Sequence, residues 1–226
     1  MVWCYKKINK IKFQLLIIMK QHLLEYWKKT KLITDKRVLA AFERIDREDF
    51  VLDEYKKQAY EDVPLPIKAD QTISQPTTIM IMTQALELKK GDKVLEIGAG
   101  SGYQAALIAE IVKPAKVYTI EYLSELALFA RQNLENVGIK NVKVICTDGS
   151  KGYDKESPYD KIIVTAACPK VPKPLLEQLK KGGILVAPVG SLYGQKMLKL
   201  KKNDEIKVED LGDFIFVKLK GEYGWK

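Results

Sequence analysis

Closely spaced glycines follow a short apolar run near the middle of the chain. Residues 94–97 read VLEI, and Gly98, Gly100 and Gly102 follow, with Tyr103 next. Glycine accepts positive φ at little cost and has no Cβ to keep a ligand away from the backbone. The pattern predicts a buried strand that turns sharply into a helix against a bound nucleotide-like cofactor.

The spacing of these glycines favours a cofactor without a pyrophosphate. The dinucleotide fingerprint GxGxxG requires a third glycine three residues after the second, and that position is Tyr103. No GK[ST] follows the turn, which argues against a phosphate-binding P-loop. Glu96, two residues before the first glycine, indicates a cationic cofactor. S-adenosylmethionine carries an ammonium and a sulfonium group, so we expect a methyltransferase that uses it.

Two further apolar runs also end in an acidic residue. Residues 116–120 precede Glu121, which is placed to bridge the two hydroxyls of a ribose. Residues 142–147 precede Asp148 and Gly149, and the Asp148 carboxylate is placed to accept a hydrogen bond from an adenine amino group. Ligands of open α/β sheets bind beyond the carboxyl ends of the strands. We therefore expect Glu96, Glu121 and Asp148 to converge on one crevice.

The bulk composition indicates one ordinary globular domain. The 226 residues are 46% hydrophobic and 30% charged, which is typical of soluble proteins with a substantial core. A net charge of +9 would suit a nucleic-acid partner, yet only four of the 38 basic residues are Arg. Arg is the usual side chain for bidentate contacts to bases and phosphates. We expect a solvated lysine surface and no nucleic-acid partner.

Histidine and cysteine are too sparse for several kinds of site. His22 is the only histidine, so any Ser/His/Asp triad or multi-histidine metal site would have to include it. Cys4, Cys146 and Cys168 lie far apart without CxxC spacing, which argues against a zinc site and a disulfide framework. We expect chemistry without histidine or metal, and a cytoplasmic protein with reduced thiols.

The elements before the glycine turn are expected to be helical at first and then extended. An apolar run at residues 13–19 is too short to span a bilayer, and we take residues 1–19 as an extension without a membrane role. Asp35 is placed to cap a helix with Val38, Ala41, Phe42 and Ile45 on one face. Residues 60–76 lose this periodicity, and their three prolines predict a long ordered loop. A helix should follow from Pro76, with its end near Gly91.

The rest of the chain alternates strands with helices. Strands are expected at residues 94–97, 116–120, 142–147, 161–165 and 184–189, with a helix opened by Pro172 and Pro174 that turns Leu175, Leu176 and Leu179 inward. This alternation predicts a mostly parallel, doubly wound α/β sheet. Period-two segments at 197–200 and 214–219 predict a C-terminal antiparallel strand pair, joined through 203–205. The expected organisation is one domain over 20–226, with a helical lead-in and substrate loop (20–76), a cofactor-binding core (77–189) and the terminal strands (190–226).

Three blocks together resemble the protein-L-isoaspartate O-methyltransferase family. They are AYEDVPLPI at 59–67, QTISQP at 71–76 and LEIGAGSGYQAAL at 95–107. Residues 164–167 and the close of the chain from 216 to 225 are similar to that family too, so the resemblance runs from about residue 20 to the end. Its most specific part is TISQP joined to the glycine block, since many methyltransferases share the second and few share the first.

The resemblance implies a Rossmann-like methyltransferase fold and a substrate. The enzyme would methylate, with S-adenosylmethionine as cofactor, the free α-carboxylate of L-isoaspartyl residues in damaged proteins and peptides. The ester then closes to a succinimide, which hydrolyses in part to normal aspartate. Such an α-carboxylate has a pKa near ~3.5 and is ionised at neutral pH, so the reaction requires no general base. A monomer without nucleic-acid or membrane partners is expected.

The resemblance also implies the site residues. Ser74, the serine of TISQP, would be the catalytic residue and donate a hydrogen bond to the substrate carboxylate. The alternative is that Ser74 or Gln75 only caps the helix that follows. The expected catalytic residue is Ser74. The residues expected to bind the cofactor are Thr72, Ile73, Glu96, Gly98, Gly100, Gly102, Tyr103, Glu121, Tyr122, Asp148 and Gly149. Those expected to bind the substrate are Gln75, Pro76, Thr165 and Ala166.

Two other functions stay open. An RNA or other small-substrate methyltransferase is one, although amino-directed enzymes of nucleic acids usually carry [DN]PP[YF] where this chain has Thr165-Ala166-Ala167-Cys168. A binder of altered proteins without turnover is the other. Within the resemblance, Lys218 replaces a common proline and Lys68-Ala69-Asp70 departs from the usual small residues, which leaves the details of the substrate loop open.

Overall fold

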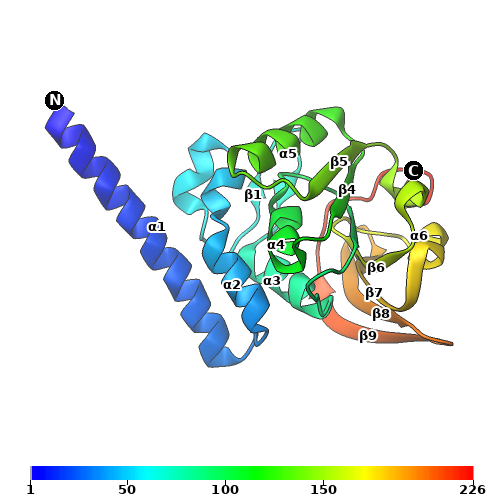
Figure 1. Ribbon diagram of the computed structural model, residues 1–226. Coiled ribbons are helices and arrows are strands. Elements are labelled where there is room, and N and C mark those ends of the chain that lie inside the picture. Colours follow the sequence, from blue (N-terminus) through cyan, green and yellow to red (C-terminus); the bar gives the residue numbers. More distant parts are fainter. Residues whose placement is uncertain (1, 226) are drawn as a thin grey trace.

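A seven-stranded sheet forms the centre of the protein (Figure 1). The computed structural model describes the backbone of residues 2–225 and the side chains of residues 14–225. The strands are β3 (Val94–Ile97), β4 (Val117–Glu121), β5 (Val142–Cys146), β6 (Tyr159–Val164), β7 (Leu179–Ser191), β8 (Gly194–Lys202) and β9 (Ile206–Phe214). Their order is β5-β4-β3-β6-β7-β8-β9. The first five strands of this order run parallel, and β8 and β9 complete the sheet in antiparallel pairing.

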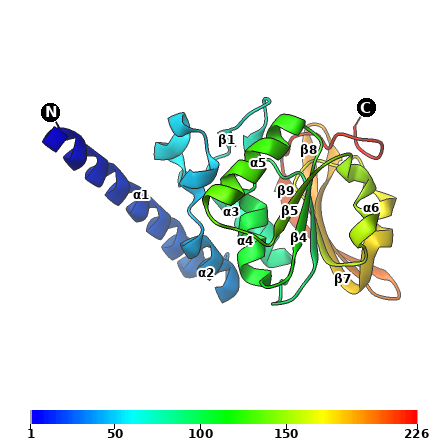
Figure 2. The ribbon, with the colours of Figure 1, turned by 45° about the horizontal axis from the view of Figure 1, so that its top comes forward.

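Helices cover both faces of this sheet, as the alternating pattern predicts (Figure 2). On one face lie α3 (Pro76–Ala85), α4 (Tyr103–Val112) and α5 (Ser124–Asn136), and on the other lies α6 (Lys173–Gln178) beside the short helices η3 (Gly149–Lys151) and η4 (Asp154–Glu156). Side chains of β3 alternate between the two faces. Val94 packs with α3 and α4, and Leu95 and Ile97 pack in the cluster that contains Leu175 of α6. The predicted mostly parallel, doubly wound α/β sheet is thereby confirmed.

The N-terminal segment is helical, and its first helix extends away from the body of the protein (Figures 1 and 2). Helix α1 (Val2–Thr30) runs without a break through residue 19, where we expected an extension to end. Near its end, Trp27 is fully buried against Phe42 of α2 (Lys36–Arg44), with ring centroids 4.8 Å apart. Asp35 caps α2 as predicted, since its carboxylate accepts a hydrogen bond from the Arg37 N–H. Among the described residues, no helix combines the length and the apolar character needed to cross a membrane.

Between α2 and α3 the chain folds into short elements that lead to the sheet. These are η1 (Arg47–Phe50), η2 (Asp53–Gln58), β1 (Leu65–Pro66) and β2 (Thr72–Ile73). The two short strands pair antiparallel within the predicted loop at 60–76. This pairing holds the TISQP block in an extended conformation until Pro76 begins α3.

Two expectations for the C-terminal half are wrong. Leu179 does not lie on an inward helix face, because α6 ends at Gln178 and Leu179 begins β7. The last strand is β9 and not residues 214–219, although the hairpin does turn through 203–205. β9 is an edge strand with mostly exposed side chains, so no apolar alternation marks it. The apolar residues at 214–219 serve another purpose: Val217 and Leu219 exchange backbone hydrogen bonds with Ala167, next to the carboxyl end of β6.

Candidate active site

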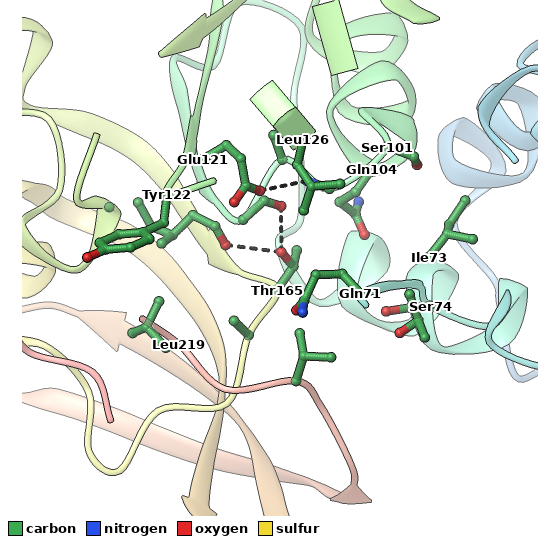
Figure 3. A pocket seen from close by; sticks show the side chains of 18 of the residues that line it. Gln71, Ile73, Ser74, Ser101, Gln104, Glu121, Tyr122, Leu126, Thr165 and Leu219 are labelled. Atoms are coloured by element: carbon green, nitrogen blue, oxygen red, sulfur yellow. Dashed lines mark hydrogen bonds between the residues drawn. The ribbon is translucent and has the colours of Figure 1, made fainter. Parts of the chain in front are cut away.

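A pocket opens at the carboxyl ends of β3, β4 and β6, where the glycine turn meets the TISQP block (Figure 3). Glu121 and Tyr122 lie at one side of it and Ser74 at the opposite side, with Gln71 and Thr165 between them. The pocket therefore joins two regions of sequence that the resemblance treats as separate blocks. Eleven of the expected site residues line it, namely Thr72, Ile73, Ser74, Gly98, Gly100, Tyr103, Glu121, Tyr122, Gly149, Thr165 and Ala166.

The three glycines of the turn have different roles. Gly98 has a φ of +100°, and a Cβ there would overlap the hydroxyl of Thr165. Gly100 has a φ of +53°, and a Cβ there would meet only the Ile67 side chain at 3.7 Å, so its backbone is bare toward the pocket. Gly102 instead holds the N-cap position of α4 and faces α5, where a Cβ would lie 3.3 Å from Ala130 and from Leu134. Gly102 does not line the pocket, and its lack of a side chain serves helix packing.

Glu121 presents a rigidly held carboxylate at the end of β4. Its Oε2 accepts the Gly100 N–H at 3.0 Å, and its Oε1 accepts the Leu123 N–H at 3.0 Å. Each carboxylate oxygen can accept a further hydrogen bond. Because Glu121 also lines the pocket, it can receive the two hydroxyls of a ribose.

Glu96 does not line the pocket, contrary to the expectation from its place before the glycines. Strand alternation puts its side chain on the same face as Val94, toward α3 and α4. The residue is fully buried, and among the described residues neither carboxylate oxygen has a hydrogen-bond partner. Burial raises the pKa of Glu96 to about 8, so the carboxyl is neutral at pH 7. A neutral carboxyl inside the domain does not attract a cationic cofactor by charge.

Asp148 also lies outside the pocket lining. Its Oδ1 accepts hydrogen bonds from the Ser150 N–H (2.9 Å) and hydroxyl (2.6 Å), and its Oδ2 accepts the Glu222 N–H at 2.9 Å. The carboxylate thus holds the C-terminal segment against the loop after β5. The neighbouring Gly149 does line the pocket, so the backbone of this loop borders the site while the Asp148 side chain turns to the chain terminus.

Ser74 reaches the pocket without being the cap of α3. Gln75 holds the N-cap position but makes no side-chain capping bond, and Pro76 is the first residue of the helix. Asp62 provides the cap, since its carboxylate accepts the Thr77 N–H at 2.8 Å. Gln75 and Pro76 are absent from the lining, so the structure brings only Ser74 of these three to the site.

Thr165 fixes the end of β6 against the glycine turn. Its hydroxyl lies 3.0 Å from the Ile97 carbonyl oxygen and 2.7 Å from that of Gly98. The only hydrogen of that hydroxyl is therefore directed at the protein backbone. The Thr165 hydroxyl is therefore not free to donate a hydrogen bond to a substrate, although its oxygen can still accept one.

Several lining residues were not assigned from the sequence. They include Gln71, Ser101 and Gln104 within the family blocks, and Val217, Lys218, Leu219 and Lys220 from the tail. A signal existed for the first group, because Gln71 and Ser101 stand inside the family blocks. The tail residues also lie within the family-like close of the chain at 216–225, but their pattern is that of a strand, and only the folded chain lays them across the carboxyl edge of the sheet.

These residues suit S-adenosylmethionine. The bare backbone at Gly100 and the held carboxylate of Glu121 offer close approach and ribose recognition, and Tyr122 lies beside Glu121. No group of three or more His, Cys, Asp or Glu side chains gathers as a metal site within the part of the chain that the structure describes.

Comparison with known proteins agrees with this geometry. The family model for protein-L-isoaspartate(D-aspartate) O-methyltransferase matches residues 18–224. A protein-L-isoaspartate O-methyltransferase of Pyrococcus horikoshii is 50% identical over 216 residues, which cover 91% of this chain and 98% of that protein. A solved protein-L-isoaspartate O-methyltransferase superposes with a TM-score of 0.80 at 32% identity, over 94% of this chain and 67% of the other.

A second solved structure adds the cofactor. It is a Plasmodium falciparum protein assigned to the same methyltransferase class, in complex with S-adenosyl-L-homocysteine. It superposes with a TM-score of 0.77 at 26% identity and covers 88% of this chain and 97% of its own. This chain is an S-adenosylmethionine-dependent methyltransferase, and it belongs to the protein-L-isoaspartate(D-aspartate) O-methyltransferase family.

Proposed function

We propose that this protein methylates the free α-carboxylate of L-isoaspartyl residues in damaged proteins and peptides. The observation that carries the proposal is the shared pocket: Glu121 and Gly100 border one side, and Ser74 of the TISQP block borders the other. A methyl donor held at the first side would face a carboxylate bound at the second. S-adenosylmethionine, when bound, supplies an electrophilic methyl group.

The binding of the cofactor is assigned to residues at the strand ends. Glu121 would accept the ribose hydroxyls, because its two oxygens are already oriented by the N–H groups of Gly100 and Leu123. Preorganised acceptors lose little entropy when the ligand arrives. Thr72, Ile73, Gly98, Tyr103, Tyr122 and Gly149 complete the wall that we assign to the cofactor.

Ser74 is assigned to the substrate. Its hydroxyl would donate a hydrogen bond to the α-carboxylate of the substrate. The substrate oxygen is ionised at neutral pH, so the residues have to orient it and keep water out rather than remove a proton. Ile79, Met82 and Leu126 supply apolar walls, and residues 217–220 cover the pocket from the tail.

The product accounts for a repair function. Methylation turns the α-carboxylate into an ester, and the following backbone amide nitrogen displaces methanol from it to close a succinimide. Hydrolysis of the succinimide returns part of the residue to normal aspartate. The cytoplasmic location, the monomeric state and the absence of nucleic-acid and membrane partners remain predictions.

Methanol release from a peptide pair tests the proposal. An isoaspartyl peptide and its ordinary aspartyl twin are incubated with S-adenosylmethionine, and total RNA serves as a further acceptor. We expect methanol from the isoaspartyl peptide alone. Equal release from both peptides, or methyl incorporation into RNA only, would contradict it.

A further inference from the structure

Arg47 is a fully buried cation directly behind the TISQP block. It begins η1, and its guanidinium donates from Nη1 to the Ser74 carbonyl oxygen at 2.8 Å and from Nε to the Ala59 carbonyl oxygen at 2.7 Å. The third nitrogen, Nη2, has no hydrogen-bond partner among the described residues. One side chain thus ties the start of the substrate loop to the residue that we place at the reaction centre.

The charge of Arg47 is not neutralised by its hydrogen-bond partners. Both guanidinium acceptors are backbone carbonyls. The negative charge of Asp62 favours the protonated form of Arg47 through space and so acts to raise its pKa. The Asp62 carboxylate itself is hydrogen-bonded to the N–H and hydroxyl of Thr77. Burial lowers the pKa of Arg47 to about 10, so the side chain keeps its charge at neutral pH. A buried charge without an ionic partner is costly, and an apolar residue of similar size would serve packing alone better.

Arg47 also lies against a second wall of the same pocket. Its Cζ is 5.7 Å from the centroid of the Tyr103 ring, and both Tyr103 and Ser74 line the pocket. Within the low-dielectric interior the field of this cation reaches the pocket with little screening. Arg47 is itself absent from the lining, so it acts through its neighbours.

We propose that Arg47 is a positioning residue for the substrate: it fixes the backbone of Ser74 and supplies the positive potential that favours a carboxylate beside that residue. The inference rests on the proposed function. Arg47 would thus compensate the negative charge of the substrate from behind the wall, in addition to Lys218 and Lys220 of the tail, which line the pocket itself.

Two variants of Arg47 separate charge from geometry. Arg47→Met removes the charge at similar length, and Arg47→Lys keeps a charge but loses the planar fork that reaches both carbonyls. Arg44→Met is the matched control, because it removes an exposed Arg three residues earlier that pairs with Glu110. For each protein we would measure KM and kcat with the isoaspartyl peptide, the Kd of S-adenosylhomocysteine and the melting temperature.

The expected result is a selective loss of peptide binding. Arg47→Met should raise the peptide KM by about tenfold or more, with the S-adenosylhomocysteine Kd within about twofold of wild type. Arg47→Lys should recover part of the loss, and Arg44→Met should behave as wild type. The KM ratio should persist at about 1 M salt, since buried charges are screened weakly.

Other results would overturn the inference. An unchanged peptide KM in Arg47→Met would contradict it. A parallel fall of cofactor affinity, melting temperature and activity in both Arg47 variants would also contradict it, because that pattern indicates a structural role only. Should Arg47→Met not fold, a wild-type KM in Arg47→Lys would contradict the need for the Ser74 contact. If the wild-type enzyme leaves the isoaspartyl peptide unmethylated, the proposed function fails and this inference with it.

Discussion

The carboxylate of Asp62 binds Thr77 twice, since it accepts the backbone N–H at 2.8 Å and the hydroxyl at 2.6 Å. Asp62 comes from the loop before β1, and Thr77 is the second residue of α3. The helix that follows the TISQP block is therefore capped from outside that block. Because neither Ser74 nor Gln75 is needed as a cap, the serine is available to the pocket.

Removing this cap should destabilise the protein without touching the pocket. Asp62→Ala leaves the backbone N–H of Thr77, in the first turn of α3, without its acceptor, and loss of a capping side chain costs about 1 kcal/mol. Urea denaturation should show that decrease. Glu61→Ala is the control, an exposed neighbour of the same charge, and should leave the midpoint unchanged. Equal midpoints for the two variants would argue that the Asp62 contact adds nothing.

Ser74→Ala should reduce methyl transfer far more than stability. A hydrogen bond to a charged group contributes roughly 1.5–3 kcal/mol, so we expect kcat/KM with the isoaspartyl peptide to fall on the order of tenfold to a hundredfold. The melting temperature should change little, because the Ser74 side chain does not cap α3. Ser74→Thr keeps the hydroxyl and should retain more activity. A fully active Ser74→Ala enzyme would remove Ser74 from the reaction centre.

Glu121→Gln should weaken cofactor binding and leave peptide binding unchanged. In Glu121 one carboxylate oxygen accepts the Gly100 N–H and the other accepts the Leu123 N–H. The Gln side chain replaces one of these oxygens with an NH2 group, so one of the two N–H groups loses its acceptor. We expect calorimetry to show an S-adenosylhomocysteine Kd raised by about tenfold or more. The peptide KM at saturating cofactor should stay close to wild type. Glu125→Gln, an exposed change on the first turn of α5, provides the control, and equal affinities in the two variants would refute the assignment.

Gly98→Ala should be more damaging than the same change at Gly138. Both residues have positive φ, but a Cβ at Gly138 meets open space while one at Gly98 overlaps the Thr165 hydroxyl. Strain alone costs about 1 kcal/mol, and the clash adds to it at Gly98. Denaturation midpoints and S-adenosylhomocysteine binding would both be measured. The prediction fails if the two variants lose stability equally and Gly98→Ala still binds.

Glu96 should make the protein less stable at alkaline pH. Burial raises its pKa from 4.5 to about 8, so the folded state holds a proton that the unfolded state has already released. The contribution of Glu96 to stability is fully present below about pH 4.5 and is lost as the pH rises through about 8. Melting curves from pH 5 to 9 should fall less steeply for Glu96→Gln than for wild type. Parallel curves would show that Glu96 is ionised in the folded protein.

Much of the fold follows from local patterns. The glycine turn, the five parallel strands and the capped helix at 36–44 depend on residue-level preferences, since φ and side-chain polarity act within a few positions. The family blocks added Ser74 and the isoaspartyl substrate, which periodicity alone does not specify.

The direction of each side chain depended on contacts between distant parts of the chain. Glu96 and Asp148 have the same acidic character as Glu121, and nothing in their immediate neighbours tells them apart. Alternation along β3 directs Glu96 to the helices, and the returning C-terminus engages Asp148. Residues 217–220 reach the pocket, and Arg47 lies behind it, only because the loop and the tail fold back onto the sheet.

The sequence by itself therefore determined the class of the protein, its cofactor and the order of its elements, because those depend on residue types and short-range periodicity. Only the tertiary structure decided which acids border the pocket, what caps α3 and which buried cation lies behind Ser74. The physical reason is that packing and strand register, which join residues far apart in the chain, select the face on which each side chain is exposed or buried.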